Sequence, residues 1–298
     1  MASLRRGELV ILPTETVYGL AADAADPRAV AAVFEAKGRP AFNPLIAHVA
    51  DLAAAQRVAV LDARAQALAQ AFWPGPLTLV APIHDPVAVC DLARAGLDTV
   101  AVRVPAHPVA RTLLAAFGGA VVAPSANRSG RPSPTRFADA FEETGFAAGA
   151  ALDGGACEIG LESTVVAALD GPLRLLRPGA VTRDQIEAIA GPLAEAQSDA
   201  HRSPGRLALH YAPDAPVRLE AEGPRAGEIF LGFGPGAGEA RFNLSPAGDL
   251  RQAAANLFTF LRAADRLHPA AIAVARIPND GLGEAINDRL RRAAGFVG

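Results

Sequence analysis

The stretch EAKGRPAFNPLIAHV, residues 35–49, places Lys37 within two residues of Arg39. Lys and Arg together number 28, and Lys37 is the one lysine among them. An ammonium is a compact point charge that shifts its pKa readily on burial, whereas a guanidinium is a rigid planar fork. We therefore interpret Lys37 and Arg39 as candidates for binding phosphate or handling an amine, with a charged helix C-terminus as the alternative.

Three further groups of polar residues stand in or directly after predicted strands. Arg103 lies among apolar residues in DTVAVRVP, as a carboxylate-binding guanidinium or a surface arginine with a buried stem would. His48 in LIAHVA is either a ligand-binding residue or a hydrogen-bonded core histidine. The segment APSANRSGRPSPT offers hydroxyl, amide and backbone N–H donors for phosphate, and a plain surface loop is its other interpretation.

The common catalytic and nucleotide-binding motifs are missing from the chain. It contains no G-x-x-x-x-G-K-[ST], no H-E-x-x-H, no Cys/His cluster and no G-x-S-x-G. GFGPGAG near Gly232 has the wrong spacing for a dinucleotide fingerprint and is interpreted as a turn. Cys90 and Cys157 share no short spacing, which predicts reduced thiols. An anion site would therefore have to combine scattered cations.

Composition limits the class of protein. A chain of 298 residues with 51% hydrophobic and 20% charged residues predicts one large folded domain or two ordinary ones. The formal net charge of -3 provides no bulk attraction to nucleic acid or to an anionic membrane. No segment approaches the roughly 18 apolar residues of a membrane span, and the N-terminal apolar run is too short for a signal peptide. We expect a soluble cytoplasmic protein with no membrane partner.

Hydrophobic periodicity predicts alternating strands and helices over residues 1–191. In one strand, Val100, Val102 and Val104 should face one side, and Ala101 and Arg103 the other. Strands are predicted at ELVILP, LIAHVA, LTLVAPI, DTVAVRVP, AVVA, ESTVVAAL and LRLLRPG. Helices are predicted at DPRAVAAVFEAK, ARAQALAQAFW, HPVARTLLAAFG and TRDQIEAIAG.

Residues 192–216 lose this periodicity and contain several prolines, which predicts a linker. Beyond it, EIFLGFG, DLRQAAANLFTFLRAADRL, AIAVARIP and GLGEAINDRLRRAAG predict a small α/β domain over residues 217–298. We interpret its arginines at positions 289, 291 and 292 as a solvated helix face rather than a docking patch.

Six segments, in their order along the chain, resemble the YrdC-like family: PTETVYGL, KGRPAFNPLIAHV, VAVRVP, APSANRSGRPSPT, LESTVV and LRPGAVT. The linker SPGRLALHYAP and the second α/β domain resemble the long form of that family, the two-domain threonylcarbamoyl-AMP synthases. The resemblance implies an α/β fold. It comprises a YrdC-like twisted mixed sheet with flanking helices and an open concave site, joined by an extended linker to a smaller Rossmann-like α/β domain.

The resemblance also implies an activity. The family makes L-threonylcarbamoyladenylate from L-threonine, bicarbonate or CO2, and ATP, and releases pyrophosphate. Mg²⁺ is expected with the ATP, and no protein metal site is expected. A downstream tRNA-modifying transferase complex would use the product to form threonylcarbamoyl-adenosine beside the anticodon.

Site residues follow from the resemblance, position by position. Lys37 and Arg39 would be catalytic. The residues expected to bind L-threonine are Thr16, His48, Arg103, Ala123 and Ser163. The residues expected to bind ATP are Arg39, Asn43, Thr99, Ser125, Asn127, Ser133, Arg177 and Tyr211. Where the family usually has a methionine after SPG in the linker, this chain has Arg206.

Two other functional classes are the alternatives. One is a non-catalytic RNA-binding module; because acidic residues outnumber basic ones in the first 190 residues, only weak RNA binding is left open. The other is a carbamoyl transferase, since a related domain serves hydrogenase maturation. Those proteins carry zinc-finger and acylphosphatase-like sections that this sequence lacks. Threonine-dependent release of pyrophosphate would distinguish the synthase from both.

Overall fold

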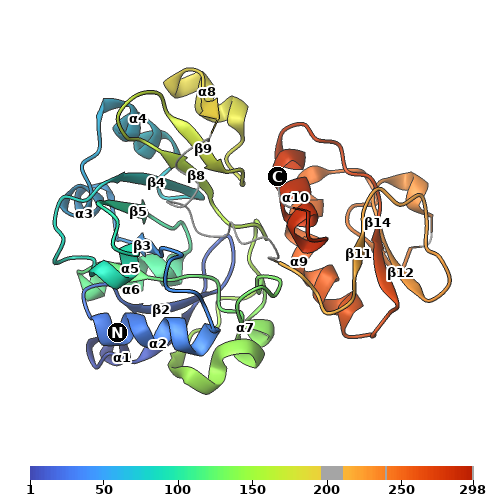
Figure 1. The fold of residues 1–298 in the computed structure, drawn as a ribbon, viewed down its shortest axis with the longest axis horizontal. Coiled ribbons are helices and arrows are strands. Elements are labelled where there is room, and N and C mark those ends of the chain that lie inside the picture. The colour runs from blue at the N-terminus through green and yellow to red at the C-terminus, as the bar shows by residue number, and fades with distance from the viewer. Residues whose placement is uncertain (196–210, 239, 297–298) are drawn as a thin grey trace.

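The computed structural model describes residues 1–195, 211–238 and 240–296, and these form two parts, each built on its own β-sheet (Figure 1). Within the described residues the larger sheet has ten strands in the order β10-β9-β8-β4-β5-β3-β6-β2-β1-β7. These strands are β1 (Leu9–Leu12), β2 (Gly19–Asp23), β3 (Ile46–His48), β4 (Leu77–Pro82), β5 (Thr99–Arg103), β6 (Val121–Val122), β7 (Ala148–Ala151), β8 (Thr164–Ala167), β9 (Arg174–Arg177) and β10 (Ala194–Glu195).

The larger sheet is mixed, as the resemblance implied. Its central strand β5 pairs parallel with β3 and antiparallel with β4, and β4 pairs parallel with β8. In the register of β3 with β5, His48 stands opposite Arg103. Because parallel strands end at the same edge of a sheet, these two side chains reach one site from residues far apart in sequence.

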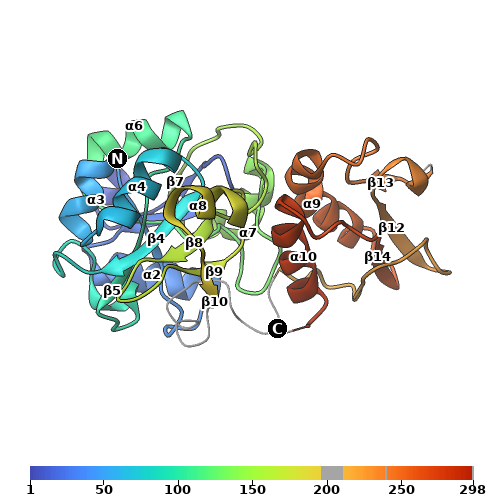
Figure 2. The ribbon, with the colours of Figure 1, turned by 90° about the horizontal axis from the view of Figure 1, so that it is seen from above.

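Helices flank both faces of this sheet (Figures 1 and 2). They are α1 (Ala2–Arg5), α2 (Pro27–Lys37), α3 (Leu52–Val58), α4 (Ala63–Phe72), α5 (Asp91–Arg94), α6 (Pro108–Phe117), α7 (Phe137–Thr144) and α8 (Arg183–Ala190), with a 3-10 turn η1 (Gly145–Ala147). The larger hydrophobic core takes apolar residues from α2, α3, α4, α7 and α8. A second core packs α1 and α6 against other strand residues.

The alternation predicted for β5 is confirmed. Val100, Val102 and Val104 all belong to the larger core. Ala101 belongs to a separate cluster with residues of β3, β4, β8 and β9. The strand is therefore buried on both faces, and a polar side chain on it must find its partners inside the protein.

The ends of α2 determine where its functional loop begins. Asp26 caps the N-terminus by accepting a hydrogen bond from the backbone N–H of Arg28, and Pro27 occupies the first turn. Gly38 ends the helix with φ 59° and ψ 37°, a left-handed conformation that glycine adopts without a Cβ clash. Lys37 therefore stands on the last turn, and Arg39 begins the next loop.

The smaller part is an α/β unit whose four described strands all pair in parallel, in the order β11-β14-β12-β13. Its elements are β11 (Val217–Arg218), β12 (Glu228–Gly232), η3 (Pro235–Ala237), β13 (Phe242–Asn243), α9 (Leu250–Asp265), β14 (Ala271–Val274) and α10 (Leu282–Ala293). The turn predicted after Gly232 is confirmed, because β12 ends there and η3 follows.

The predicted linker, residues 192–216, lies largely outside the described residues, since 196–210 are not described. In its described part, Ala194–Glu195 forms β10 and pairs in parallel with β9, which the irregular sequence did not predict. The domain boundaries at 191 and 217 stay a prediction. Among the described residues, none of the helices is long and apolar enough to cross a membrane.

Ion pairs join the two parts across their contact. Arg262 on α9 donates to Glu143 Oε1 on α7 at 2.9 Å, and Arg289 on α10 donates to Glu162 Oε2 at 2.8 Å. Thr135 and Thr259 exchange a hydrogen bond at 2.8 Å in the same contact. The prediction of a solvated helix face was therefore wrong for Arg289, whose side chain is 0% exposed. Hydrophobic periodicity could not reveal this, because Glu162, the acidic partner in the other part, is 127 positions away in the chain.

Candidate active site

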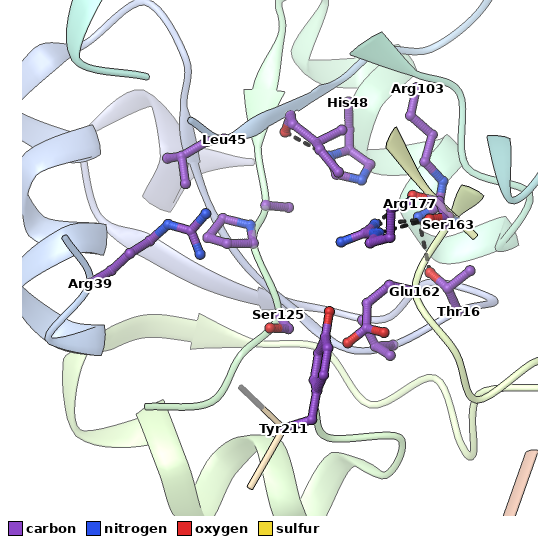
Figure 3. A pocket seen from close by; sticks show the side chains of 14 residues that line it. Thr16, Arg39, Leu45, His48, Arg103, Ser125, Glu162, Ser163, Arg177 and Tyr211 are labelled. Carbon is purple, nitrogen blue, oxygen red and sulfur yellow. Dashed lines mark hydrogen bonds between the residues drawn. The ribbon is translucent and has the colours of Figure 1, made fainter. Parts of the chain in front are cut away.

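A cavity of about 50 Å³ opens where β3, β5 and β9 end and the segments before β2 and β8 converge (Figure 3). Polar and charged side chains make up much of its wall. The residues that line it are Thr16, Val17, Arg39, Leu45, Ile46, His48, Arg103, Ala123, Pro124, Ser125, Glu162, Ser163, Arg177 and Tyr211. This wall draws on segments from residue 16 to residue 211, so the cavity exists only in the folded chain.

Nine of the sequence-predicted site residues meet at this cavity: Thr16, Arg39, His48, Arg103, Ala123, Ser125, Ser163, Arg177 and Tyr211. Five others do not belong to its wall: Lys37, Asn43, Thr99, Asn127 and Ser133. Four of these five lie next to wall residues, as described below. Thr99 stands at the start of β5, the opposite end of the strand from Arg103.

Lys37 connects the end of α2 to the segment that follows β6. Its side chain is buried, and its Nζ donates hydrogen bonds to the backbone carbonyls of Ser125 and Asn127. Burial and the positive charge of nearby Arg39 lower the pKa of Lys37 well below its usual value. In this conformation the ammonium holds residues 125–127, the S-x-N segment, in place. A contact of Lys37 with phosphate or bicarbonate stays a prediction.

Arg39 extends from the same loop into the cavity (Figure 3). Its Nε donates to the carbonyl of Asn43 at 3.2 Å, and its Nη2 donates to the carbonyl of Pro44 at 3.1 Å. Burial lowers the pKa of Arg39 to about 10, and the positive charge of Arg177 acts in the same direction. The guanidinium remains charged at neutral pH and presents its charge to a confined space.

Arg177, at the end of β9, is the second cation directed into the cavity (Figure 3). Its Nε and Nη2 donate to the carbonyl of Ser163 at 3.1 and 2.9 Å, and Nη2 also reaches Ser163 Oγ at 3.2 Å. Ser163 Oγ in turn shares a hydrogen bond with Thr78 Oγ1 at 2.7 Å. Burial lowers the pKa of Arg177 as well. These contacts fix the guanidinium against the start of β8.

Arg103 is buried, so its interpretation as a surface arginine was wrong. Its Nη2 donates to Glu15 Oε1 at 2.6 Å, its Nη1 donates to Thr16 Oγ1 at 3.0 Å, and its Nε donates to the carbonyl of Gly75 at 3.2 Å. The pKa of Glu15 is lowered, because the attraction of Arg103 outweighs the opposing effect of burial. Arg103 thus binds a carboxylate, as its chemistry suggested, and here the carboxylate belongs to the protein.

His48 lies opposite Arg103 on β3 and lines the same cavity. Its Nδ1 donates to the carbonyl of Ile46 at 3.1 Å. Burial, with a smaller contribution from the charge of Arg103, lowers the pKa of His48 to about 3. The imidazole is therefore neutral at physiological pH and adds no further cation beside Arg103.

Tyr211 closes the cavity on the side of the smaller part. Its φ of 63° is in the left-handed region, which a bulky residue seldom adopts. Its ring is buried and packs against Phe258 of α9 with centroids 5.4 Å apart. This contact holds Tyr211 at the cavity wall.

Glu162 is a cavity residue that sequence reasoning missed. It lines the cavity beside Ser163, accepts a hydrogen bond from Ser133 Oγ on Oε1, and accepts one from Arg289 on Oε2. The signal was available, because an acidic residue at the first position of the predicted strand ESTVVAAL needs a partner if that strand is buried. Its distant cationic partner had no signal in the sequence.

Comparison with protein-family models matches almost the whole chain. Residues 2–179 match the family model Sua5_yciO_yrdC, described as "Telomere recombination". Residues 181–295 match a second model, described as "Threonylcarbamoyl-AMP synthase, C-terminal domain". The two matches follow one another along the chain with one residue between them.

The chain is also similar to characterised proteins over nearly its full length. A threonylcarbamoyl-AMP synthase of Bacillus subtilis is 38% identical over 99% of this chain and 91% of its own length. One of Pyrococcus abyssi is 40% identical over 98% of this chain and 92% of its own. The crystal structure of P. abyssi Sua5 complexed with L-threonine superposes with a TM-score of 0.90 at 39% identity, covering 99% of this chain and 93% of that one.

Proposed function

This chain belongs to the family of two-domain threonylcarbamoyl-AMP synthases, and we propose that it makes L-threonylcarbamoyladenylate from L-threonine, bicarbonate or CO2, and ATP. The observation that carries the proposal is one cavity with two kinds of wall. Arg39, partly buried, and Arg177, buried, supply cations to it, and Arg103 and His48 supply a carboxylate-binding group and a neutral hydrogen-bonding group. A zwitterionic amino acid and a polyanionic nucleotide need these two environments side by side.

The threonine half of the site comprises Thr16, His48, Arg103, Ala123 and Ser163. Arg103 already binds the carboxylate of Glu15, so it has the geometry to share a substrate carboxylate. Neutral His48 suits the threonine hydroxyl, because it can exchange a hydrogen bond without adding charge. The name of the P. abyssi structure, a complex with L-threonine, supports this choice of amino acid.

The nucleotide half comprises Arg39, Arg177, Ser125 and Tyr211 at the wall, with Asn43, Thr99, Asn127 and Ser133 as further predicted contacts. Two of these further residues carry buried polar atoms that suit a ligand. Asn43 Nδ2 and Asn127 Oδ1 have no hydrogen-bond partner among the described residues. A buried unsatisfied donor or acceptor is costly, and ATP entering the site would supply the missing partner.

The chemistry has two steps. The neutral amine of threonine attacks the carbon of CO2 to form a carbamate and release a proton, or that of bicarbonate to form the same carbamate and release water. A carbamate oxygen then attacks the α-phosphorus of ATP, and the bond from that phosphorus to the bridging oxygen breaks as pyrophosphate leaves. Arg39 and Arg177 stabilise the charge that develops on the leaving group, and Lys37 holds the S-x-N segment that faces the nucleotide. Exclusion of water protects the carbamate between the two steps.

Mg²⁺ enters with the nucleotide in this proposal. Glu162 is a carboxylate in the wall, and its two oxygens already accept hydrogen bonds from Ser133 and Arg289. Phosphate oxygens and water would therefore supply most ligands of that ion.

The product has a defined use in this proposal. A downstream tRNA-modifying transferase complex takes the adenylate and forms threonylcarbamoyl-adenosine beside the anticodon, which makes the cytoplasm the place of action. Weak binding of RNA by this chain would assist that transfer.

The test is pyrophosphate release from ATP, measured with and without L-threonine and bicarbonate, for the wild type and Lys37→Ala. We expect release that requires both co-substrates and is lost in the variant, because the S-x-N segment then loses its anchor. A folded wild type that releases no pyrophosphate in response to threonine would overturn the proposal and favour the RNA-binding alternative.

A further inference from the structure

Arg289 is the most completely buried charged side chain near the cavity, and it comes from the smaller part of the molecule. It stands on α10, which faces the larger part in Figure 1, and its exposed fraction is 0%. Its Nε donates to Glu162 Oε2 at 2.8 Å, and its Nη1 donates to the carbonyl of Pro178 at 2.9 Å. Its guanidinium also lies over the ring of Tyr211, 5.4 Å from the centroid.

These three contacts concern the cavity wall, and a fourth, from Nη1 to Asp288 Oδ2 at 2.7 Å, stays within α10. Glu162 and Tyr211 line the cavity, and Pro178 directly follows Arg177, which lines it as well. Arg289 therefore touches two wall residues and the backbone next to a third, although its own side chain does not line the cavity.

Glu162 has an unfavourable charge for its position. Its carboxylate stands in the wall of a cavity to which Arg39 and Arg177 bring positive charge. An uncompensated carboxylate there would repel a triphosphate, and inside a protein that repulsion is poorly screened. Arg289 supplies the compensating charge from behind, and Ser133 orients the other carboxylate oxygen.

We propose that Arg289 is a positioning residue of the nucleotide site: it neutralises Glu162, orients it toward Ser133, and makes ATP binding depend on the smaller part of the chain. This inference rests on the proposed function in that it takes ATP as the ligand. It gives the smaller part a role in substrate binding in addition to its contact with the larger part.

A second ion pair across the same contact provides a matched control. Arg266, just after α9, donates to Asp139 and Glu142 of α7, each at 2.6 Å. Neither carboxylate lines the cavity. Loss of Arg266 should weaken the contact between the two parts and leave the cavity wall unchanged, whereas loss of Arg289 should change the wall itself.

The experiment measures the dissociation constants of ATP and of L-threonine by calorimetry for the full-length wild type, Arg289→Met and Arg266→Met. We expect Arg289→Met to bind ATP on the order of tenfold more weakly, because Glu162 then repels the triphosphate. Threonine binding should change by less than about threefold, since a zwitterion has little net charge. Arg266→Met should bind both ligands as the wild type does.

Removal of the carboxylate distinguishes neutralisation from a purely structural role. In the double variant Glu162→Gln/Arg289→Met, no charge remains at position 162 and Asp288 keeps its ion pair with Arg292, so ATP affinity should return to within about threefold of the wild type. Glu162→Gln alone keeps Arg289 and should bind ATP at least as tightly as the wild type. This single variant also tests the inference if Arg289→Met does not fold.

Three results would overturn the inference: unchanged ATP affinity in Arg289→Met, no recovery in the double variant, or markedly weaker ATP binding by Glu162→Gln. Pyrophosphate release is measured on the same samples. A wild type that binds ATP but does not release pyrophosphate with threonine would contradict the proposed function, and the affinities of the variants would still decide the role of Arg289. A wild type that does not bind ATP would contradict both.

Discussion

The arginines at the contact between the two parts and those at the cavity differ in their partners. At the contact between the two parts, Arg262 and Arg289 each donate to a carboxylate of the other part, at 2.9 and 2.8 Å. In the cavity, Arg39 donates to the carbonyls of Asn43 and Pro44, and no carboxylate among the described residues accepts from it. The contact arginines are buried and neutralised, whereas Arg39 is only partly buried and has no carboxylate partner among the described residues.

This difference indicates that the arginines at the contact stabilise the fold and that those at the cavity bind the ligand. Burial of a cation is costly, and a nearby carboxylate offsets much of that cost, whereas carbonyl dipoles offset less. Arg39 shows the remaining cost in its pKa, which burial lowers to about 10. A cation without a carboxylate partner in a small cavity thus attracts an anionic ligand. A cation paired with a carboxylate across a contact stabilises the association of the two surfaces. Each prediction below tests one side of this comparison.

The largest effect is expected for Arg39→Met in the cavity. Removing a positioned charge from the leaving group should lower the rate of pyrophosphate release about 100-fold or more, roughly 3 kcal/mol. The free energy of unfolding should stay the same or rise, because a poorly compensated buried cation is removed. Steady-state kinetics and urea unfolding measure the two quantities.

Arg57→Met is the control for Arg39→Met, because Arg57 is an exposed arginine of α3. It should leave the rate of pyrophosphate release and the free energy of unfolding unchanged. If Arg39→Met lost stability in proportion to activity, the contrast between the two groups would fail.

Arg262→Met tests the opposite side of the comparison. Its loss leaves Glu143 buried with weaker contacts to Arg128 and removes a hydrogen bond to the carbonyl of Pro132. The free energy of unfolding should fall by about 2 to 3 kcal/mol. The KM for ATP should change by less than about threefold. Urea unfolding checks the first expectation, and a large rise in KM without loss of stability would contradict the comparison.

Lys37→Arg asks whether the single lysine can be replaced by the other cation. Lys37 is buried at 3% exposure, and its ammonium fits between two carbonyls of the S-x-N segment. A guanidinium is larger and should displace that segment, at a cost of about 2 kcal/mol in stability. The temperature of thermal unfolding and the rate of pyrophosphate release should both fall. Full activity in this variant would mean that a point charge is not required there.

The smallest effect concerns pH and His48. Its pKa in the folded protein is about 3, well below its ordinary value of 6.5, so between these values the unfolded chain binds a proton that the folded chain does not. Stability should therefore fall as pH falls below about 6.5, by at most about 1.4 kcal/mol per pH unit from this group. His48→Asn should flatten the profile of unfolding free energy against pH.

His84 is exposed, and His84→Asn serves as the control for His48→Asn. It should leave the slope of unfolding free energy against pH as in the wild type. An equal slope in His48→Asn and the wild type between pH 6.5 and 5 would show that the folded protein protonates His48 as readily as the unfolded chain does.

The elements could be predicted from sequence wherever local periodicity was strong. The helix at 183–190 has its Thr182 cap with a reciprocal hydrogen bond from Gln185, and β5 has its alternating valines. The short strand Ala194–Glu195 was missed, because two residues carry no periodic signal and pairing with β9 alone creates it. The resemblance to the YrdC-like family also led to nine of the cavity-lining residues, of which eight lie in or beside predicted strands and one, Tyr211, lies in the predicted linker.

The pairing of charges could not be predicted in the same way. Arg289 was interpreted as part of a solvated face, because RLRR at the end of an amphipathic helix has the composition of one. Glu162 was passed over beside Ser163, and Glu15 beside Thr16. Each of these side chains is buried through a contact with a residue at least 88 positions away.

The sequence by itself determined most of the longer elements, the presence of two α/β parts and the residue types available for anion binding, since these follow from periodicity and short motifs within a few turns of chain. Tertiary structure alone decided which cations are neutralised and which remain available. Burial and charge compensation depend on segments that meet only in the folded protein, as Arg289 and Glu162 do at 2.8 Å.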